Sequence, residues 1–361
     1  MRIKVLVVDD TIFFRKIISE ILTTFPFVEV VGTANNGEIA MSRIKLLKPH
    51  LLTLDVEMPV MNGLQVLQAI RRQGLPVDCL MLSSKTVRGC EITMQSLELG
   101  AFDFITKPDD LSPEVNLDIL TRELRRKLKI YSERMRMLVA RGRQPQPLPA
   151  AVPPAGGRGV VAELPATTTR MEKSRAIAIG VSTGGPYALS RVLPALPGDI
   201  GVPIFLVQHM PPLFTESLAH SLDAKCRLTV KEGVDGEVVR DNFVYVAPGG
   251  KQMMVASGVG HAKLIRVTDA PPENNCKPSV DYLFRSVARE YGSKATCVIM
   301  TGMGTDGKLG LSVTRASGAV NIAQNEESCV VYGMPRAAVE AGLINVVAPL
   351  DNIAEAILKT V

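Results

Sequence analysis

The chain has 361 residues, 46% of them hydrophobic, which is enough for two domains with buried cores. Aromatic residues make up only 4% and tryptophan is absent, which argues against an aromatic-rich surface for nucleic acids. The formal net charge is +5, but the segment Arg122 to Arg143 alone holds nine Lys/Arg and two Glu, a net of +7. The remainder is therefore slightly acidic, and no nucleic-acid partner is expected.

The six cysteines include no Cys-x-x-Cys pair, so neither a zinc site nor a disulfide framework is predicted. No apolar run approaches the ~20 residues that cross a bilayer. The apolar run Ile3–Val8 follows the first residues directly, without the pattern of a secretory leader. These features predict a cytoplasmic protein that does not insert into a membrane.

Apolar runs alternate with amphipathic stretches through the first 125 residues or so, which is typical of a parallel sheet covered by helices. Five strands are expected, at Ile3–Val8, Val28–Thr33, Leu51–Asp55, Cys79–Ser83 and Phe104–Ile105. Five helices are expected, near Ile12–Thr24, Gly37–Lys48, Gly63–Gln73, Arg88–Leu99 and Pro113–Lys129.

Polar residues follow these strands at their carboxyl ends, where parallel sheets bind ligands. Asp9 and Asp10 follow the first strand, Asp55 ends the third and Lys107 follows the fifth. Carboxylate oxygens suit Mg²⁺, and a lysine offers a compact positive charge to a phosphoryl oxygen. Together these residues predict a site for Mg²⁺ and a phosphoryl group.

The same stretches resemble a response-regulator receiver domain over residues 1–122. The resemblance is carried by Val7–Asp10, Leu54–Pro59, Asn62-Gly63, Ser83-Ser84 and Thr106–Pro108. It implies that a sensor histidine kinase donates the phosphoryl group. It assigns the phospho-acceptor to Asp55, a Mg²⁺ ligand to Asp10 with Asp9 beside it, a backbone carbonyl ligand to Glu57, the switch hydroxyl to Ser83, the switch aromatic to Phe104 and the phosphate-contacting lysine to Lys107.

Residues 123–173 are expected to form a basic helix and a linker that connect two domains. The helical pattern continues past Lys129 with many Arg and Met residues, and a solvated basic face is its simplest interpretation. Contact of this face with the second domain or with an acidic partner stays open. Six prolines fall between Gln144 and Thr169, a composition that predicts a semi-extended linker.

Residues 174–361 repeat the alternation, so we expect two tandem doubly wound α/β domains. The first has a five-stranded parallel sheet, and the second a larger, mostly parallel sheet. Strands are expected at Ala176–Ile179, Ile204–Val207, Phe243–Val246, Lys251–Val255, Cys297–Met300, Ala319–Ala323 and Asn345–Ala348. Helices are expected at Tyr187–Ala195, Thr215–Leu222, Val280–Tyr291, Lys308–Ala316, Pro335–Ala341 and Asp351–Lys359. Leu228–Val267 is expected to form a hairpin or small antiparallel patch.

The stretch Gly180–Gly185 contains Gly-x-Ser-x-Gly between a strand and a helix. Such a turn exposes a serine hydroxyl and directs backbone amides toward a developing oxyanion. Ser182 is therefore a candidate nucleophile, although Gly and Ser are also ordinary turn residues. The amide after the serine, in Thr183, is a candidate for oxyanion support.

A serine nucleophile needs a base and a carboxylate that orients it. His209 ends the run from Ile204 on the same sheet edge, whereas His261 is ambiguous. Asp306 follows another strand within Thr301–Gly307, where the Met303 amide could complete an oxyanion site. The order Ser, His, Asp differs from that of α/β-hydrolases and argues against their fold.

These motifs, with Pro278–Asp281 and Ala247–Gly249, resemble the catalytic domain of the chemotaxis receptor methylesterases. The resemblance implies the triad Ser182, His209 and Asp306. The substrates it implies are glutamyl methyl esters of methyl-accepting chemoreceptors, with glutamine deamidation as a second activity. No cofactor is expected for hydrolysis itself. Phosphorylation of the first domain is expected to relieve a block of the second.

Three other function classes compete with this interpretation. A catalytically dead scaffold is disfavoured by the intact Ser, His and Asp set. A DNA-binding output is disfavoured because no basic helix-turn-helix pattern follows the linker. A nucleotide-binding domain is disfavoured because Gly180–Gly185 lacks the Gly-Lys-Ser/Thr ending of a phosphate loop.

Overall fold

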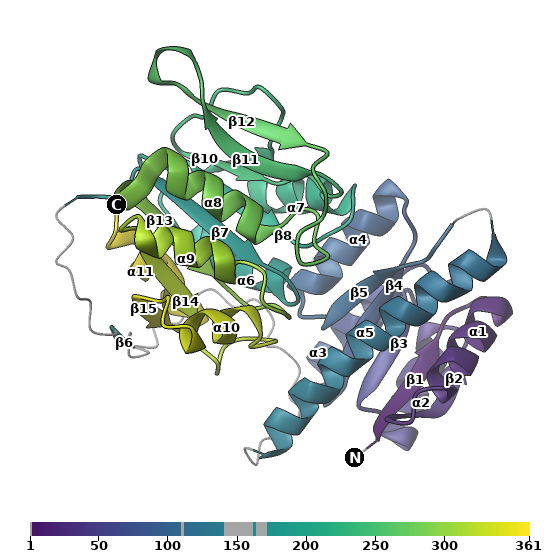
Figure 1. Ribbon diagram of the computed structural model, residues 1–361. Coiled ribbons are helices and arrows are strands. Elements are labelled where there is room, and N and C mark those ends of the chain that lie inside the picture. The colour runs from purple at the N-terminus through teal and green to yellow at the C-terminus, as the bar shows by residue number, and fades with distance from the viewer. Residues whose placement is uncertain (1, 110–111, 141–161, 164–171) are drawn as a thin grey trace. The chain divides into compact units, whose positions relative to one another are not determined.

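The computed structural model describes residues 2–109, 112–140, 162–163 and 172–361. The chain forms two compact units, Met1–Ala151 and Val152–Val361. The expected linker, Gln144–Thr169, lies outside the described residues except for 162–163. Each unit contains its own parallel sheet (Figure 1).

The first unit is a five-stranded parallel sheet in the order β2-β1-β3-β4-β5, with a helix after each strand (Figure 1). Its strands are β1 Ile3–Val8, β2 Val28–Ala34, β3 Leu51–Asp55, β4 Asp78–Ser83 and β5 Asp103–Thr106. Its helices are α1 Ile12–Thr23, α2 Gly37–Leu47, α3 Gly63–Arg72, α4 Val87–Glu98 and α5 Pro113–Ala140. Every residue of β3 and β4 is buried, as expected for central strands covered on both faces. The predicted fold of this unit is confirmed.

Helix α5 is longer than predicted, and part of its basic character is buried. The Lys127 side chain is only 10% exposed and forms an ion pair with Asp103. Arg134 donates to Asp78 Oδ2 at 2.7 Å, and the buried Tyr131 hydroxyl donates to the His50 carbonyl at 2.7 Å. A wholly solvated basic face is therefore wrong: these residues fasten the helix to its own domain.

The second unit has an eight-stranded sheet in the order β6-β15-β14-β13-β7-β8-β10-β9. All of its pairs are parallel except β6 with β15. The strands are β6 Ala162–Glu163, β7 Ala176–Val181, β8 Ile204–Gln208, β9 Thr229–Glu232, β10 Phe243–Val246, β13 Ala295–Ile299, β14 Val320–Gln324 and β15 Val346–Ala348. The helices are α6 Gly185–Val192, α7 Phe214–Asp223, α8 Val280–Tyr291, α9 Lys308–Ala316, α10 Met334–Glu340 and α11 Ile353–Leu358.

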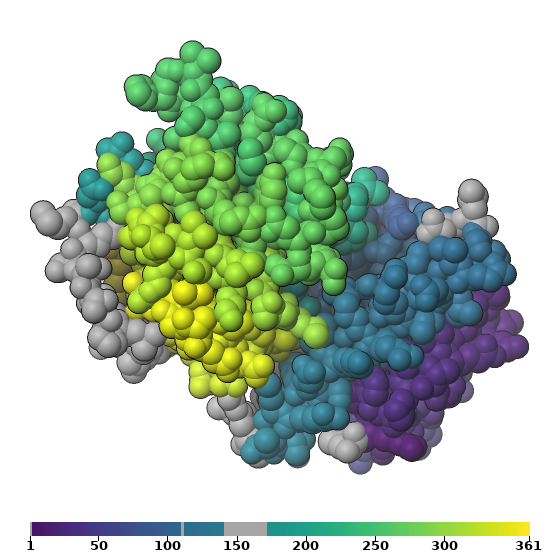
Figure 2. All heavy atoms as spheres, viewed as in Figure 1, coloured from purple at the N-terminus to yellow at the C-terminus, as the bar shows by residue number. Residues whose placement is uncertain are grey.

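The predicted antiparallel patch is confirmed as a single hairpin, formed by β11 Gln252–Ser257 and β12 Lys263–Thr268. Their connecting loop projects from the unit in Figure 2, and its Val259 is 97% exposed. Strands β9 and β10, which fall in the same predicted stretch, instead extend the main sheet in parallel. Sequence alternation cannot distinguish the two outcomes, because the direction of a short edge strand depends on its distant partner.

Helix α8 packs unusually close to the central strand β7. A Cβ atom added at Gly180 would lie 2.3 Å from the Val280 side chain. Val280 is the first residue of α8, so the missing side chain lets the helix N-terminus lie beside the end of β7. Ser279 caps this helix by accepting from the Tyr282 amide. The close approach places a set of backbone N–H donors at the carboxyl edge of the sheet.

Candidate active site

Ser182, His209 and Asp306 come from loops after three adjacent strands, β7, β8 and β13. Val181 and Gln208 are register partners at the ends of β7 and β8, so Ser182 and His209 follow a paired position. The His209 amide also donates to the Val181 carbonyl at 3.2 Å. The parallel sheet therefore places residues that are far apart in the sequence at the same carboxyl edge.

The turn at Ser182 is strand, tight turn and helix. The Ser182 amide donates to the Thr301 carbonyl at 2.9 Å, and the Gly185 amide donates to the Ser182 carbonyl at 2.8 Å. Gly184 has a φ of 80°, in the left-handed region that favours glycine. The buried Gln208 amide donates to the Ser182 and His209 carbonyls, which ties the serine and histidine turns together.

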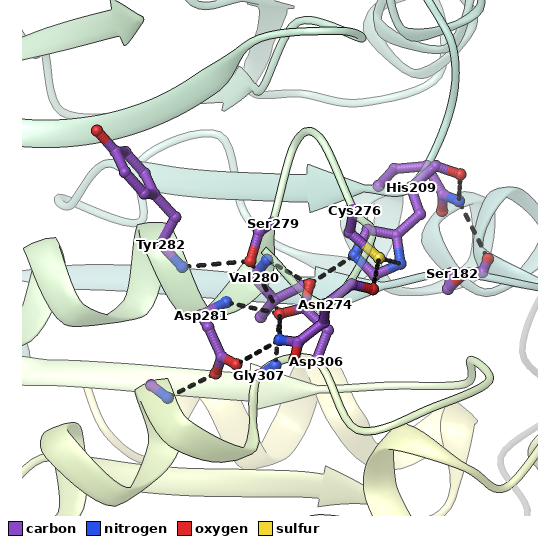
Figure 3. Close-up of polar contacts among 12 residues, drawn as sticks. Ser182, His209, Asn274, Cys276, Ser279, Val280, Asp281, Tyr282, Asp306 and Gly307 are labelled. Atoms are coloured by element: carbon purple, nitrogen blue, oxygen red, sulfur yellow. Dashed lines mark hydrogen bonds and ion pairs between the residues drawn. The ribbon is translucent and has the colours of Figure 1, made fainter. Parts of the chain in front are cut away.

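Asp306 is almost fully buried and holds His209 by a hydrogen bond of 2.8 Å between Nε2 and Oδ2 (Figure 3). Its carboxylate also faces the N-terminus of α8. Backbone amides donate to it at 2.7–3.1 Å, and two side chains donate at 2.9 and 3.0 Å. These donors are the amides of Val280, Asp281 and Gly307, the Ser279 hydroxyl and the Asn274 amide group.

These hydrogen-bond donors stabilise the ionised form of the Asp306 carboxylate. Burial alone would raise the pKa of Asp306. The hydrogen bond to His209, the charge of His209 and the backbone amides lower it by a larger amount, so the pKa lies well below its ordinary value. The carboxylate therefore stays ionised at any physiological pH. A permanently charged, immobile carboxylate is what a base-orienting residue requires.

The sequence analysis assigned no role to Asn274. Its side-chain amide donates to Asp306 at 3.0 Å and to the buried Asp281 at 2.8 Å. Asp281 in turn accepts from the Gly310 amide at 2.6 Å, which joins α8 to α9. Asn274 lies in a short turn outside the helices and main strands, so no periodic pattern could indicate it.

Burial lowers the pKa of His209, but hydrogen bonds to Asp306 and Cys276 more than offset this and raise it to about 9. Nε2 is engaged by Asp306, which leaves Nδ1 for proton transfer. In the part of the chain that the structure describes, no hydrogen bond joins Ser182 to His209. Figure 3 shows Ser182 beyond His209 as seen from Asp306. Hydrogen bonds between catalytic groups often tighten only when substrate is bound.

Thr183 and Met303, the predicted supports, both lie next to the serine turn. Thr183 is buried, and its carbonyl accepts from the Thr301 hydroxyl at 2.9 Å. Gly302 approaches so closely that an added Cβ would lie 2.7 Å from the Ser182 Cβ. Met303, the next residue, is 39% exposed at the surface. The two loops form one contiguous edge around Ser182.

The first unit gathers a second polar cluster at the carboxyl edge of its own sheet. Ligand oxygens of Asp9, Asp10 and Asp55 lie within 4.8 Å of one another. Lys107 Nζ lies 2.8 Å from Asp9 and 2.7 Å from Asp55. Burial raises the pKa of Asp55 to about 6 although Lys107 opposes this. The Glu57 amide donates to Asp55 Oδ1 at 3.4 Å.

The two predicted switch residues are buried beside this cluster. Ser83 accepts from the Thr93 hydroxyl at 2.7 Å and donates to the Gly89 carbonyl at 3.2 Å, so its hydroxyl is engaged by α4. Phe104 is 7% exposed within β5. Neither side chain makes a hydrogen bond to Asp55 among the described contacts.

Residues 177–357 match the family described as CheB methylesterase, and residues 5–115 match the response regulator receiver domain. This chain belongs to the CheB methylesterase family. A CheB-family relative from Desulfotalea psychrophila, named protein-glutamate methylesterase/protein-glutamine glutaminase, is 50% identical, covering 99% of this chain and 98% of its own. The Bacillus subtilis protein of the same name is 45% identical, with the same coverage.

The second unit also resembles a solved CheB structure. The crystal structure of the Thermotoga maritima CheB methylesterase catalytic domain matches with a TM-score of 0.51 and 40% sequence identity. It covers 53% of this chain and all of that one. Among the described residues, no helix is long and apolar enough to cross a membrane.

Proposed function

We propose that this protein hydrolyses glutamyl methyl esters of methyl-accepting chemoreceptors, releasing methanol, and deamidates glutamine side chains of the same substrates. The relatives' name supplies glutamate methyl esters and glutamines of proteins as substrates. The resemblance to the chemotaxis receptor methylesterases implies that chemoreceptors carry them. The observation that carries the proposal is the His209–Asp306 hydrogen bond of 2.8 Å at the edge that also presents Ser182.

Ser182 is the proposed nucleophile. Its Oγ attacks the ester carbonyl while His209 takes the hydroxyl proton at Nδ1, and Asp306 stabilises the resulting imidazolium from Nε2. His209 then returns the proton to the methoxide as the C–O bond breaks, and methanol leaves. Water, deprotonated by His209, attacks the acyl-enzyme and releases the glutamate carboxylate and Ser182. With an amide substrate the same steps release ammonia.

The tetrahedral oxyanion needs donors that face Ser182. The loops of Thr183 and Met303 meet at the serine, and backbone N–H groups from these two loops are the proposed oxyanion site. Such donors typically contribute about 10²–10³-fold to the rate.

Methanol release from methylated receptors tests the nucleophile. Ser182→Ala should lose activity, whereas the matched control Ser190→Ala should keep it. Ser190 lies on α6 and its hydroxyl donates only to the Tyr187 carbonyl within that helix. Unchanged methanol release by Ser182→Ala would remove this serine from the mechanism.

Asp55 is the proposed site of phosphorylation by a sensor histidine kinase. The oxygen-rich cluster of Asp9, Asp10 and Asp55 fits a hard cation, and Mg²⁺ would be held by Asp10, Asp55 and the Glu57 carbonyl. When bound, Mg²⁺ neutralises charge on the phosphoryl oxygens. Lys107, which contacts both Asp9 and Asp55, offers its ammonium to the phosphoryl group.

Phosphorylation is proposed to raise hydrolysis by shifting the receiver away from a blocking arrangement. The fragment from about residue 170 onward tests this, since it contains every element of the second unit from β7 to α11. It should release methanol faster than the unphosphorylated full chain. A fragment no faster than the full chain would contradict inhibition by the receiver.

A further inference from the structure

Cys276 lies at the ring nitrogen of His209 that Asp306 leaves open. Its Sγ is 3.7 Å from His209 Nδ1, while Asp306 Oδ2 is 2.8 Å from Nε2. Figure 3 shows the two dashed contacts reaching the ring at its two nitrogens. Ligand atoms of Cys276, His209 and Asp306 all lie within 4.8 Å of one another. Thiolate sulfur and imidazole nitrogen are both common zinc ligands, and a carboxylate on the other ring nitrogen is a common partner of a zinc-bound histidine.

The backbone holds Cys276 in place rather than leaving it on a loose loop. Residues Glu273 to Cys276 form a tight turn in which the Cys276 amide donates to the Glu273 carbonyl at 2.7 Å and the Glu273 amide returns a bond of 3.1 Å. Asn274 and Asn275, the central residues, have positive φ angles of 51° and 59°. This is the geometry of a two-residue hairpin turn. The thiol is therefore preorganised beside the imidazole.

The distance between Cys276 Sγ and His209 Nδ1 fits a single Zn²⁺ ion bound by both atoms. Bonds of about 2.3 Å to sulfur and about 2.0 Å to nitrogen, at a tetrahedral angle, place the two ligands about 3.5 Å apart. The observed 3.7 Å needs only a small adjustment. Asp306 would remain on Nε2, where a carboxylate orients a metal-bound histidine and increases its basicity.

We propose that Cys276 and His209 bind Zn²⁺, with water completing the coordination, and that the bound ion inhibits hydrolysis. Binding forms Zn–S and Zn–N bonds and releases to solvent the thiol proton and, where the imidazole is protonated, the proton of His209 Nδ1. It also occupies the Nδ1 lone pair that accepts the Ser182 proton, so no base remains. The inhibitory part of the inference rests on the proposed role of His209, whereas the binding part does not.

The ligand atoms at the Cys276–His209 site are softer than those of the Asp9, Asp10 and Asp55 cluster, so the two sites should prefer different metal ions. The cluster of Asp9, Asp10 and Asp55 offers oxygen atoms, which favour Mg²⁺. Cys276 and His209 offer sulfur and nitrogen, which favour Zn²⁺ or its spectroscopic substitute Cd²⁺. Excess Mg²⁺ should therefore saturate the first cluster without protecting the second.

The test titrates the full chain with Cd²⁺ in excess Mg²⁺ and a phosphine reductant, following the thiolate-to-metal charge-transfer absorption. The band should appear in the unmodified protein and in Cys226→Ser, a control at another partly exposed cysteine. It should be absent in Cys276→Ser and weakened in His209→Gln. Zn²⁺ should displace Cd²⁺, and its Kd should rise at least about tenfold in Cys276→Ser. A band that persists in Cys276→Ser, or none in the unmodified protein, would overturn the site.

The activity arm measures methanol release with and without Zn²⁺. Zn²⁺ should lower the rate of the unmodified protein at least about tenfold, reversibly with a chelator, and leave Cys276→Ser near its own metal-free rate. Equal inhibition of both proteins would refute the inference. The charge-transfer band should be kept in Ser182→Ala, because this variant retains both ligands. If Ser182→Ala still releases methanol, the proposed mechanism fails while the binding result stands on its own.

Discussion

Each unit places a buried aspartate at the carboxyl edge of a parallel sheet, but the pKa values of the two aspartates shift in opposite directions. Asp55 faces two other carboxylates and one lysine, and burial raises its pKa to about 6. Asp306 faces an imidazole, backbone amides and two polar side chains, and its pKa is lowered. The donors around each carboxylate, rather than its position on the sheet, decide whether it is poised to react or kept as a fixed charge.

The largest expected effect comes from neutralising the fixed charge. Asp306→Asn should lower kcat for methanol release by about 10⁴-fold, because an amide can no longer favour the correct tautomer of His209. The exposed Asp351, which pairs with Arg191, provides the control Asp351→Asn. A loss of less than tenfold in Asp306→Asn would mean that this carboxylate does not orient the base.

The pH dependence should follow the base that Asp306 supports. The neutral imidazole is the active form, and the pKa of His209 is about 9. The ratio kcat/KM should therefore rise about tenfold per pH unit below that value and level off above it. Hydrolysis by Ser182→Ala supplies the hydroxide background to be subtracted. A profile flat between pH 7 and pH 9 would contradict protonation of His209 in the free enzyme.

Removing one donor from Asp306 should have a smaller effect. Asn274→Ala deletes hydrogen bonds to both Asp306 and Asp281, and kcat should fall about tenfold, the cost of one charge-assisted bond. Asn274→Asp, of similar size, should be worse because it adds a negative charge between two carboxylates. Equal rates in the two variants would show that Asn274 acts only as a spacer.

The smallest effect on the basal rate is expected at the reactive carboxylate. Asp55→Asn should leave unphosphorylated hydrolysis within about twofold, since Asp55 belongs to the first unit whereas Ser182, His209 and Asp306 all belong to the second. Stimulation by a small-molecule phosphodonor with Mg²⁺ should be lost completely. Stimulation that survives in Asp55→Asn would place the phosphoryl group on another residue.

Most strands of both sheets could be predicted because they are continuous apolar runs, whereas the short strands β6 and β9 were not predicted. The edge positions of Asp55, Ser182, His209 and Asp306 follow from strand ends. The Glu273–Cys276 turn could not be predicted, because its residues have no periodicity and act through partners far along the chain. The ion pairs that Lys127 and Arg134 form with buried aspartates could not be predicted from the sequence either, since each aspartate lies on a strand more than 20 residues away. Parallel topology is thus readable from local patterns, whereas the donors around a carboxylate depend on long-range packing.

The absence of a side chain at Gly180 allows the N-terminus of α8 to pack against β7. Even a methyl group there would meet Val280 at 2.3 Å and would push the first turn of α8 away from β7. That turn supplies two of the amides that hold Asp306, whereas Ser182 follows β7 itself. The spacing between Ser182 and Asp306 therefore depends on the absence of a side chain at Gly180, and Gly180→Ala would displace the residues of the proposed triad relative to one another without altering any of them.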